Sequence, residues 1–154
     1  MPERAPSVLV LGIDFGTRRI GLATGNTLTG TARPLNTIHH DGAPAEEIDR
    51  IIQSWKPGWI VVGLPLAADG SETDSSRAAR RFAAELHARH PEIEMSFQDE
   101  RYSSTMADAQ FAKARRDGHA RRRDARNLDS VAAAIIVESW LAASRPAVRT
   151  EFSP

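Results

Sequence analysis

The chain contains no cysteine at all. This absence excludes disulfide frameworks, thiolate nucleophiles and cysteine-ligated zinc or iron–sulfur sites, so any metal must bind oxygen or imidazole ligands. Long hydrophobic runs are also lacking, because the longest, 8–13 and 59–66, fall far short of the roughly 20 residues that cross a bilayer. The N-terminal segment has no hydrophobic stretch after a basic start, as a signal peptide would. We therefore expect no membrane role and a cytoplasmic location.

The chain also has a formal net charge of zero at pH 7, because 20 Lys and Arg residues offset 20 Asp and Glu residues. The distribution of charge is uneven, since seven basic residues and only two acidic ones lie between positions 113 and 126. A local positive field attracts phosphate groups, and the total for the whole chain conceals it. This basic segment is therefore a candidate contact for a polyanion, the alternative being a solvated run of charge.

The pattern of apolar residues predicts one mixed sheet covered by helices, which is an α/β fold. Residues 8–13 are continuously apolar, as in a strand that is buried on both faces. We expect further strands at 20–25, 31–38, 59–63 and 93–97, the first three strands forming an antiparallel meander. Helical spacing and capping signals predict helices over 45–55, from about 73 to a point before Pro91, over 105–114 and from about 128.

The chain has the length of about one ordinary domain, and it contains no internal repeat or long linker. We expect a single domain over residues 8–143, a disordered N-terminus over 1–7 and a flexible tail over 144–154. The residues expected on the buried face of the last helix are Leu128, Val131, Ala132, Ile135 and Ser139.

Three acidic residues stand where a lone carboxylate is hard to explain. Asp14 follows six apolar residues at the end of the expected central strand, and Glu100 closes the strand that begins near Ile93. Asp129 falls in the first turn of the last helix, among apolar and small residues. Burying a carboxylate costs several kcal/mol unless a cation or strong donors compensate. Because ligands gather at the carboxyl ends of parallel strands, Asp14 and Glu100 can converge there.

Each of these acids also has an ordinary structural explanation. Asp14 could accept a backbone N–H from two or three residues further along in an Asx-turn. Glu100 could be an exposed partner of Arg101, and Asp129 could favour the helix N-terminus through its charge alone. The hypothesis of a shared site requires the three acids to meet, which their spacing does not prove.

Hard oxygen ligands in the absence of thiols select Mg²⁺ or Mn²⁺. Two such ions about 4 Å apart can activate a water on one side of a phosphodiester and stabilise the leaving oxygen on the other. We therefore expect Asp14, Glu100 and Asp129 to be catalytic and to hold Mg²⁺ or Mn²⁺ as a pair of ions. His39 and His40 are expected to be surface residues, since neighbours on a strand point to opposite faces.

Five motifs, in order along the chain, carry a resemblance to a known family. They are Gly12-Ile13-Asp14-Phe15-Gly16-Thr17-Arg18-Arg19-Ile20-Gly21, Val62-Gly63-Leu64-Pro65, Asp69-Gly70-Ser71, Asp99-Glu100-Arg101-Tyr102-Ser103-Ser104-Thr105 and Leu128-Asp129-Ser130-Val131-Ala132-Ala133. Together these strings, within a stretch from about residue 8 to 143, resemble the YqgF/RuvX family. That family is similar in fold to the RuvC-type Holliday junction resolvases and is described as a nuclease of pre-16S rRNA.

The resemblance implies a ribonuclease H-like, five-stranded mixed sheet in the order 3-2-1-4-5, with the first three strands antiparallel. It implies that Asp14 is shared by both metal ions, while Glu100 and Asp129 complete the site. The nucleic-acid contacts that it implies are Arg18, Arg77, Arg101, Ser104 and Arg126. The residues that would shape the loops beside the site are Gly16, Gly63 and Pro65. Many members carry lysine a few residues before Asp129, where this chain has Arg126, so a planar guanidinium replaces a point charge.

The activity that the resemblance implies is a metal-dependent endonuclease that hydrolyses nucleic-acid phosphodiesters and matures the 5′ end of pre-16S rRNA in ribosome biogenesis. Two alternatives stay open: a Holliday junction resolvase acting on branched DNA, and a catalytically weak nucleic-acid-binding module in transcription or RNA processing. The expected partners are an rRNA precursor or branched DNA and pre-ribosomal particles, and the protein is expected to be a monomer or weak homodimer. ATP-binding proteins of the actin and sugar-kinase type have a similar first motif, but 154 residues are too few for their two domains.

Overall fold

The structure is a computed structural model, and it describes residues 7–100 and 128–144. Its centre is a five-stranded sheet in the order β3-β2-β1-β4-β5, which confirms the predicted order. β2 pairs antiparallel with β1 and with β3, whereas β4 runs parallel to both β1 and β5, so the sheet is mixed as predicted. The strands are β1 (Leu9–Phe15), β2 (Arg19–Asn26), β3 (Ala32–His39), β4 (Trp59–Leu64) and β5 (Glu94–Asp99).

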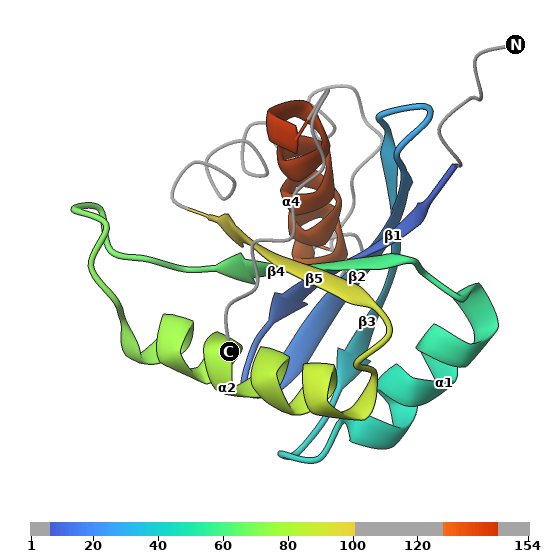
Figure 1. The fold of residues 1–154 in the computed structure, drawn as a ribbon. Coiled ribbons are helices and arrows are strands. Elements are labelled where there is room, and N and C mark those ends of the chain that lie inside the picture. Colours follow the sequence, from blue (N-terminus) through green and yellow to red (C-terminus); the bar gives the residue numbers. More distant parts are fainter. Residues whose placement is uncertain (1–6, 101–127, 145–154) are drawn as a thin grey trace, which may run out of the picture.

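Helices cover both faces of this sheet (Figure 1). α1 (Ala45–Trp55) and α2 (Asp74–Arg89) lie on one face, and α4 (Leu128–Ser144) lies across the other. None of the helices in these ranges is both long and apolar enough to cross a membrane. The helix predicted over 105–114 and the basic segment 113–126 lie outside the described residues.

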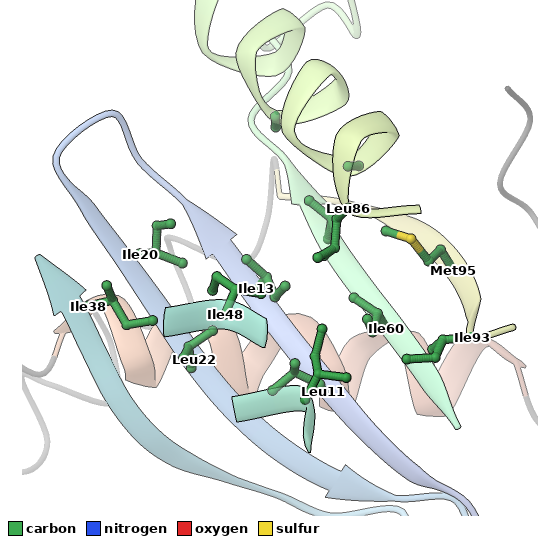
Figure 2. Packing of buried hydrophobic residues seen from close by; sticks show 14 of the residues in the cluster. Leu11, Ile13, Ile20, Leu22, Ile38, Ile48, Ile60, Leu86, Ile93 and Met95 are labelled. Carbon is green, nitrogen blue, oxygen red and sulfur yellow. The ribbon is translucent and has the colours of Figure 1, made fainter. Parts of the chain in front are cut away.

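The two faces of the sheet carry two separate hydrophobic clusters. Leu11 and Ile13 of β1 point to the side of α1 and α2, where Ile48 and Leu86 pack on them as Figure 2 shows. Val10, the neighbour of Leu11, belongs instead to the cluster under α4. Alternation along β1 therefore supplies both cores, which is why the residues before Asp14 are continuously apolar.

The buried face of α4 differs from the predicted one. Ile135 is buried as expected, but the other buried positions are Ser130, Ala133, Ala134, Ile136, Val137, Trp140 and Leu141, while Leu128, Val131, Ala132 and Ser139 are only half-buried. The reason is the closeness of the helix to the sheet. A Cβ on Gly12 would lie 3.0 Å from the carbonyl oxygen of Ala133, and a Cβ on Gly21 would lie 2.0 Å from that of Asp129. Only glycines on β1 and β2 let the helix backbone come this near, so the face of α4 at the contact is the one that carries Asp129, Ala133 and Val137.

α2 begins at a capping box, near the position that the sequence predicts. The hydroxyl of Thr73 accepts the backbone N–H of Ser76 at 3.0 Å, and the hydroxyl of Ser76 accepts the backbone N–H of Thr73 at 2.8 Å. The Thr73 hydroxyl also donates to the carbonyl oxygen of Pro65 at 2.7 Å. This contact ties the start of α2 to the residue that directly follows β4, at the edge of the sheet where the predicted acids lie.

Candidate active site

Asp14 and Glu100 lie at the carboxyl-end edge of the sheet. Asp14 is the sixth residue of β1, and Glu100 directly follows β5, with its backbone N–H donating to the carbonyl oxygen of Leu64 at 2.9 Å. Because β1 and β5 both run parallel to β4, their carboxyl ends meet at this edge. The two acids converge as predicted, because their side chains are hydrogen-bonded to each other.

β4 lies between the strands of these two acids, and Gly63 explains how they reach one another. A Cβ on Gly63 would come within 2.6 Å of the Glu100 Cδ and also within 2.6 Å of the Ile136 Cδ1. The missing side chain therefore leaves the space through which the Glu100 carboxyl crosses β4 toward Asp14. Gly63 lies inside the strand, so it shapes the site by its small size, whereas Pro65 follows the strand and belongs to the loop.

The raised pKa values of Asp14 and Glu100 indicate that the two carboxyls share a proton. Burial, the charge of Asp14 and the hydrogen bond to Asp14 together raise the pKa of Glu100 from its ordinary value of 4.5 to about 9, burial having the largest effect. Burial also raises the pKa of Asp14 to about 6, against the lowering effect of the hydrogen bond from Glu100. The neutral Glu100 carboxyl thus donates to the Asp14 carboxylate. Two buried carboxylates that need a proton to coexist form a site that a cation can also neutralise.

Asp129 approaches the pair from α4. It lies in the first turn of that helix, as predicted, and its negative charge raises the pKa of Asp14. Its carboxylate forms an ion pair with the Arg19 Nε at 3.3 Å, and the Asp129 side chain is 28% exposed. Asp129 is therefore close enough to act on Asp14 electrostatically, while Arg19 supplies it with an opposite charge.

The donor set fits a divalent cation in part. Asp14 and Glu100 offer paired, partly buried oxygens that repel each other when both are charged, and this arrangement is relieved by Mg²⁺ or Mn²⁺ as well as by a proton. Within residues 7–100 and 128–144, no group of three His, Asp or Glu residues is arranged to hold one metal ion. A third ligand from Asp129 would have to exchange its ion pair with Arg19 for the metal.

Beside Asp129 lies an open polar cavity of about 640 Å³, here called the arginine cavity. It is lined by Gly16, Thr17, Arg18, Arg19, His39, His40 and Asp129. Three of the predicted site residues thus lie at this cavity: Gly16 and Arg18, on the turn between β1 and β2, and Asp129 on α4. The cavity presents two guanidinium groups to its surroundings, which makes it suited to an anion such as phosphate.

The other predicted contacts lie elsewhere or outside the described residues. Arg77 is on the first turns of α2, where its Nη2 donates to Asp74 at 2.7 Å in an exposed ion pair. Arg101, Ser104 and Arg126 fall in the range 101–127, which the structure does not describe.

Sequence reasoning gave no role to Arg19 or His40. Arg19 is the first residue of β2, and its pairing with an acid over a hundred positions away leaves no local signal. His40 was expected to be a surface residue, but it is partly buried, with its Nε2 2.8 Å from the carbonyl oxygen of Gly16. The alternation argument was wrong for His40 because β3 ends at His39. The signal that could have identified Arg19 is the doubled arginine at the start of a strand, directly after the motif that carries Asp14.

The chain is similar to known proteins over nearly its whole length. The RuvX family model, described as Holliday junction resolvase, matches residues 8–143. A protein of Xanthomonas campestris pv. campestris (strain 8004), named "Putative pre-16S rRNA nuclease", is 43% identical over 152 residues, covering 96% of this chain and 97% of its own.

Two solved structures have a similar fold at low sequence identity. T. thermophilus RuvC in complex with a Holliday junction substrate is 18% identical, with a TM-score of 0.54 and coverage of 94% of this chain and 99% of RuvC. Fowlpox virus resolvase in complex with Holliday junction DNA is 9% identical, with a TM-score of 0.56 and coverage of 89% and 99%. These likenesses confirm the predicted ribonuclease H-like resolvase fold. With a family model that spans the whole sheet and all but the last residue of the described helices, and a relative at 43% identity over almost the entire length, this chain belongs to the RuvX family.

Proposed function

We propose that this protein is a metal-dependent endonuclease that hydrolyses nucleic-acid phosphodiesters. The observation that carries the proposal is the hydrogen-bonded pair of partly buried carboxyls, Asp14 and Glu100, at the carboxyl-end edge of the sheet, with Asp129 nearby. Desolvation destabilises two negative charges at this pair, and a bound cation would offset that cost. The arginine cavity beside Asp129 supplies positive charge for the phosphate backbone.

The proposed substrate is the precursor of 16S rRNA, cut during maturation of its 5′ end in ribosome biogenesis. The support is the name of the relative that is 43% identical over 96% of the chain. A second candidate is a branched DNA junction, because the family that matches residues 8–143 is described by that activity. Both substrates are phosphodiester polyanions, so the same acids and arginines would serve either one.

In this proposal Asp14 and Glu100 hold Mg²⁺ or Mn²⁺, and Asp129 completes the ligand set. Two bound ions supply a nucleophile at neutral pH and neutralise the leaving oxygen. Glu100 must first release the proton that it shares with Asp14, since only the charged carboxylates are strong ligands. Arg19 keeps the Asp129 carboxylate oriented at the edge of the site until then. Its guanidinium then becomes available to phosphate in the arginine cavity.

Several further features belong to the same proposal. Arg18, Arg77, Arg101, Ser104 and Arg126 are the proposed nucleic-acid contacts. A cytoplasmic location, pre-ribosomal particles as partners and a monomeric or weakly dimeric state follow from the function and stay predictions.

The test is cleavage of a 5′-extended 16S rRNA precursor and of a four-way DNA junction, with Mg²⁺ or Mn²⁺ and with a chelator. Asp14→Asn keeps the shape of the side chain but removes its charge, and it should abolish metal-dependent cleavage. Glu47→Gln, which neutralises an exposed acid on α1, is the matched control and should cleave like the wild type. Equal activity of Asp14→Asn and the wild type would refute the assigned chemistry. Binding without cleavage by the wild type would instead favour a binding module.

A further inference from the structure

A second cavity, of about 300 Å³, adjoins the arginine cavity. The two cavities share Thr17 and His40 as lining residues, so they lie on either side of the same turn. We call the second one the aromatic cavity, because Phe15, Phe82 and His40 line it together with Arg81 and Glu85. Its volume is at the lower end of the range for sites that bind small molecules.

Three rings in the aromatic cavity contact one another. Phe15 and Phe82 are stacked, with ring centroids 4.6 Å apart and an angle of 20° between the planes. The ring of His40 is tilted against Phe15 at 6.1 Å. Phe15 belongs to β1 and Phe82 to α2, and both pack against the main core. The aromatic wall is therefore built on rigid elements.

The His40 ring is held in place by both of its nitrogens. Nε2 donates to the carbonyl oxygen of Gly16 at 2.8 Å, and Nδ1 accepts the backbone N–H of Gly42 at 3.0 Å. The backbone N–H of His40 also donates to the carbonyl oxygen of Arg18 at 2.9 Å. With both ring nitrogens engaged, His40 fixes the turn that carries Arg18 and presents its ring as part of the wall.

We infer that the aromatic cavity binds one unpaired nucleobase of a nucleic-acid strand whose phosphate backbone lies in the adjoining arginine cavity. The inference rests on the proposed function, because it takes the substrate to be a nucleic acid. Aromatic walls favour a planar ring through offset or edge-to-face contacts. Arg81 and Glu85 are exposed and supply a donor and an acceptor for the polar edge of a base.

The continuity of the two cavities decides between this ligand and others. A single nucleotide carries a planar, mostly apolar ring and an anionic phosphate, joined by a sugar. The two cavities have a matching arrangement. Thr17 and His40, which line both cavities, lie between the aromatic wall of one and the two arginines of the other. An aliphatic ligand would offer no negative charge to the guanidinium groups of the arginine cavity, and an inorganic anion would leave the aromatic cavity empty. Asp129, which lines the arginine cavity, places this base next to the proposed point of cleavage.

The experiment is an abasic scan with the wild-type protein and no divalent cation. Binding of a short single-stranded oligoribonucleotide is compared with binding of the same strand lacking one base at each position in turn. Removal of the base at one position should weaken binding by about 5- to 150-fold, the range for stacking on an aromatic side chain. Phe82→Ala should weaken binding of the intact strand to a similar degree and abolish the positional effect.

Two variants keep the result interpretable. Phe82→Leu retains apolar volume against the core but removes the ring, so it should unfold at nearly the wild-type temperature while losing most of the positional effect. Trp55→Ala removes an aromatic side chain that is 41% exposed on α1 and does not line the cavity, and it should leave the scan unchanged.

A flat scan in the wild type, or an unchanged positional effect in both Phe82 variants, would overturn the inference. Because the scan measures binding alone, its outcome is independent of the cleavage assay. A wild type that shows the positional effect but fails to cleave would refute the proposed function and support the base site. A flat scan with normal cleavage would refute the base site and support the proposed function.

Discussion

The proton shared by Asp14 and Glu100 makes the stability of the metal-free protein depend on pH. The pKa of Glu100 is raised from 4.5 to about 9 in the folded protein, chiefly by burial. A folded state that holds a proton more tightly than the unfolded state loses stability as the pH rises between those two values. The contribution is complete below pH 4.5 and is lost by about pH 9. Asp49 and Glu72, whose pKa values are lowered, act in the opposite direction but at more acidic pH.

The size of the effect follows from the slope for one proton. A full proton difference changes the free energy of unfolding by about 1.4 kcal/mol per pH unit, so an increase from about pH 5.5 to 7.5 removes up to about 3 kcal/mol. For a chain of this length, 1 kcal/mol shifts the melting temperature by about 2 to 4 °C. The wild type without metal should therefore melt up to about 10 °C lower at the higher pH.

The assay is thermal unfolding in a chelator, followed by far-UV circular dichroism, of the wild type and of Glu100→Gln. The variant cannot ionise at position 100, so its melting temperature should fall much less over the same pH range. Titratable groups elsewhere contribute equally to both proteins and cancel in the comparison. Excess Mg²⁺ should restore stability to the wild type, and more at pH 7.5, because the cation takes the place of the proton. Parallel pH profiles for the two proteins would refute a shared proton at this pair.

Two substitutions test the packing around the site. Gly63→Ala places a Cβ 2.6 Å from the Glu100 Cδ, so it should reduce metal-dependent cleavage in a nuclease assay. It should also destabilise the fold by about 1 to 3 kcal/mol, measured by urea unfolding. Normal activity would mean that the Glu100 side chain has room elsewhere. Ser96→Ala removes the acceptor 2.9 Å from the buried Trp59 Nε1 and should cost about 1 to 3 kcal/mol of stability without changing cleavage, whereas an unchanged unfolding midpoint would contradict the importance of that hydrogen bond.

Local patterns in the sequence were sufficient for much of the fold and part of the site. The continuous apolar run before Asp14 and the alternating residues before Glu100 identify two strands by their burial alone. Since both acids close parallel strands, their meeting at one edge follows from sheet geometry. The strand order itself came from the resemblance to the family, because no local pattern states which strand lies between two others.

Long-range packing accounts for what the sequence did not provide. The buried face of α4 was misassigned because the helix rests on glycines of β1 and β2, and helical periodicity contains no information about that closeness. The role of Gly63 depends on the register between β4 and its neighbours. His40 was misread because a one-residue change in the end of β3 decides whether strand alternation applies.

The ion pair of Asp129 with Arg19 bears on how the three acids can act together. The Asp129 side chain is 28% exposed and the Arg19 side chain is 56% exposed, so solvent screens this ion pair. Exposed ion pairs contribute at most about 1 kcal/mol to stability. One proton removes one of the two negative charges of the Asp14–Glu100 pair, and the Arg19 guanidinium offsets the charge of Asp129. Each of these positive partners can leave without a change in the backbone, since Arg19 is exposed and a proton is lost to solvent. The fixed strands and the close contact of α4 with Gly21 therefore hold all three acids near their proposed working positions before any cation binds.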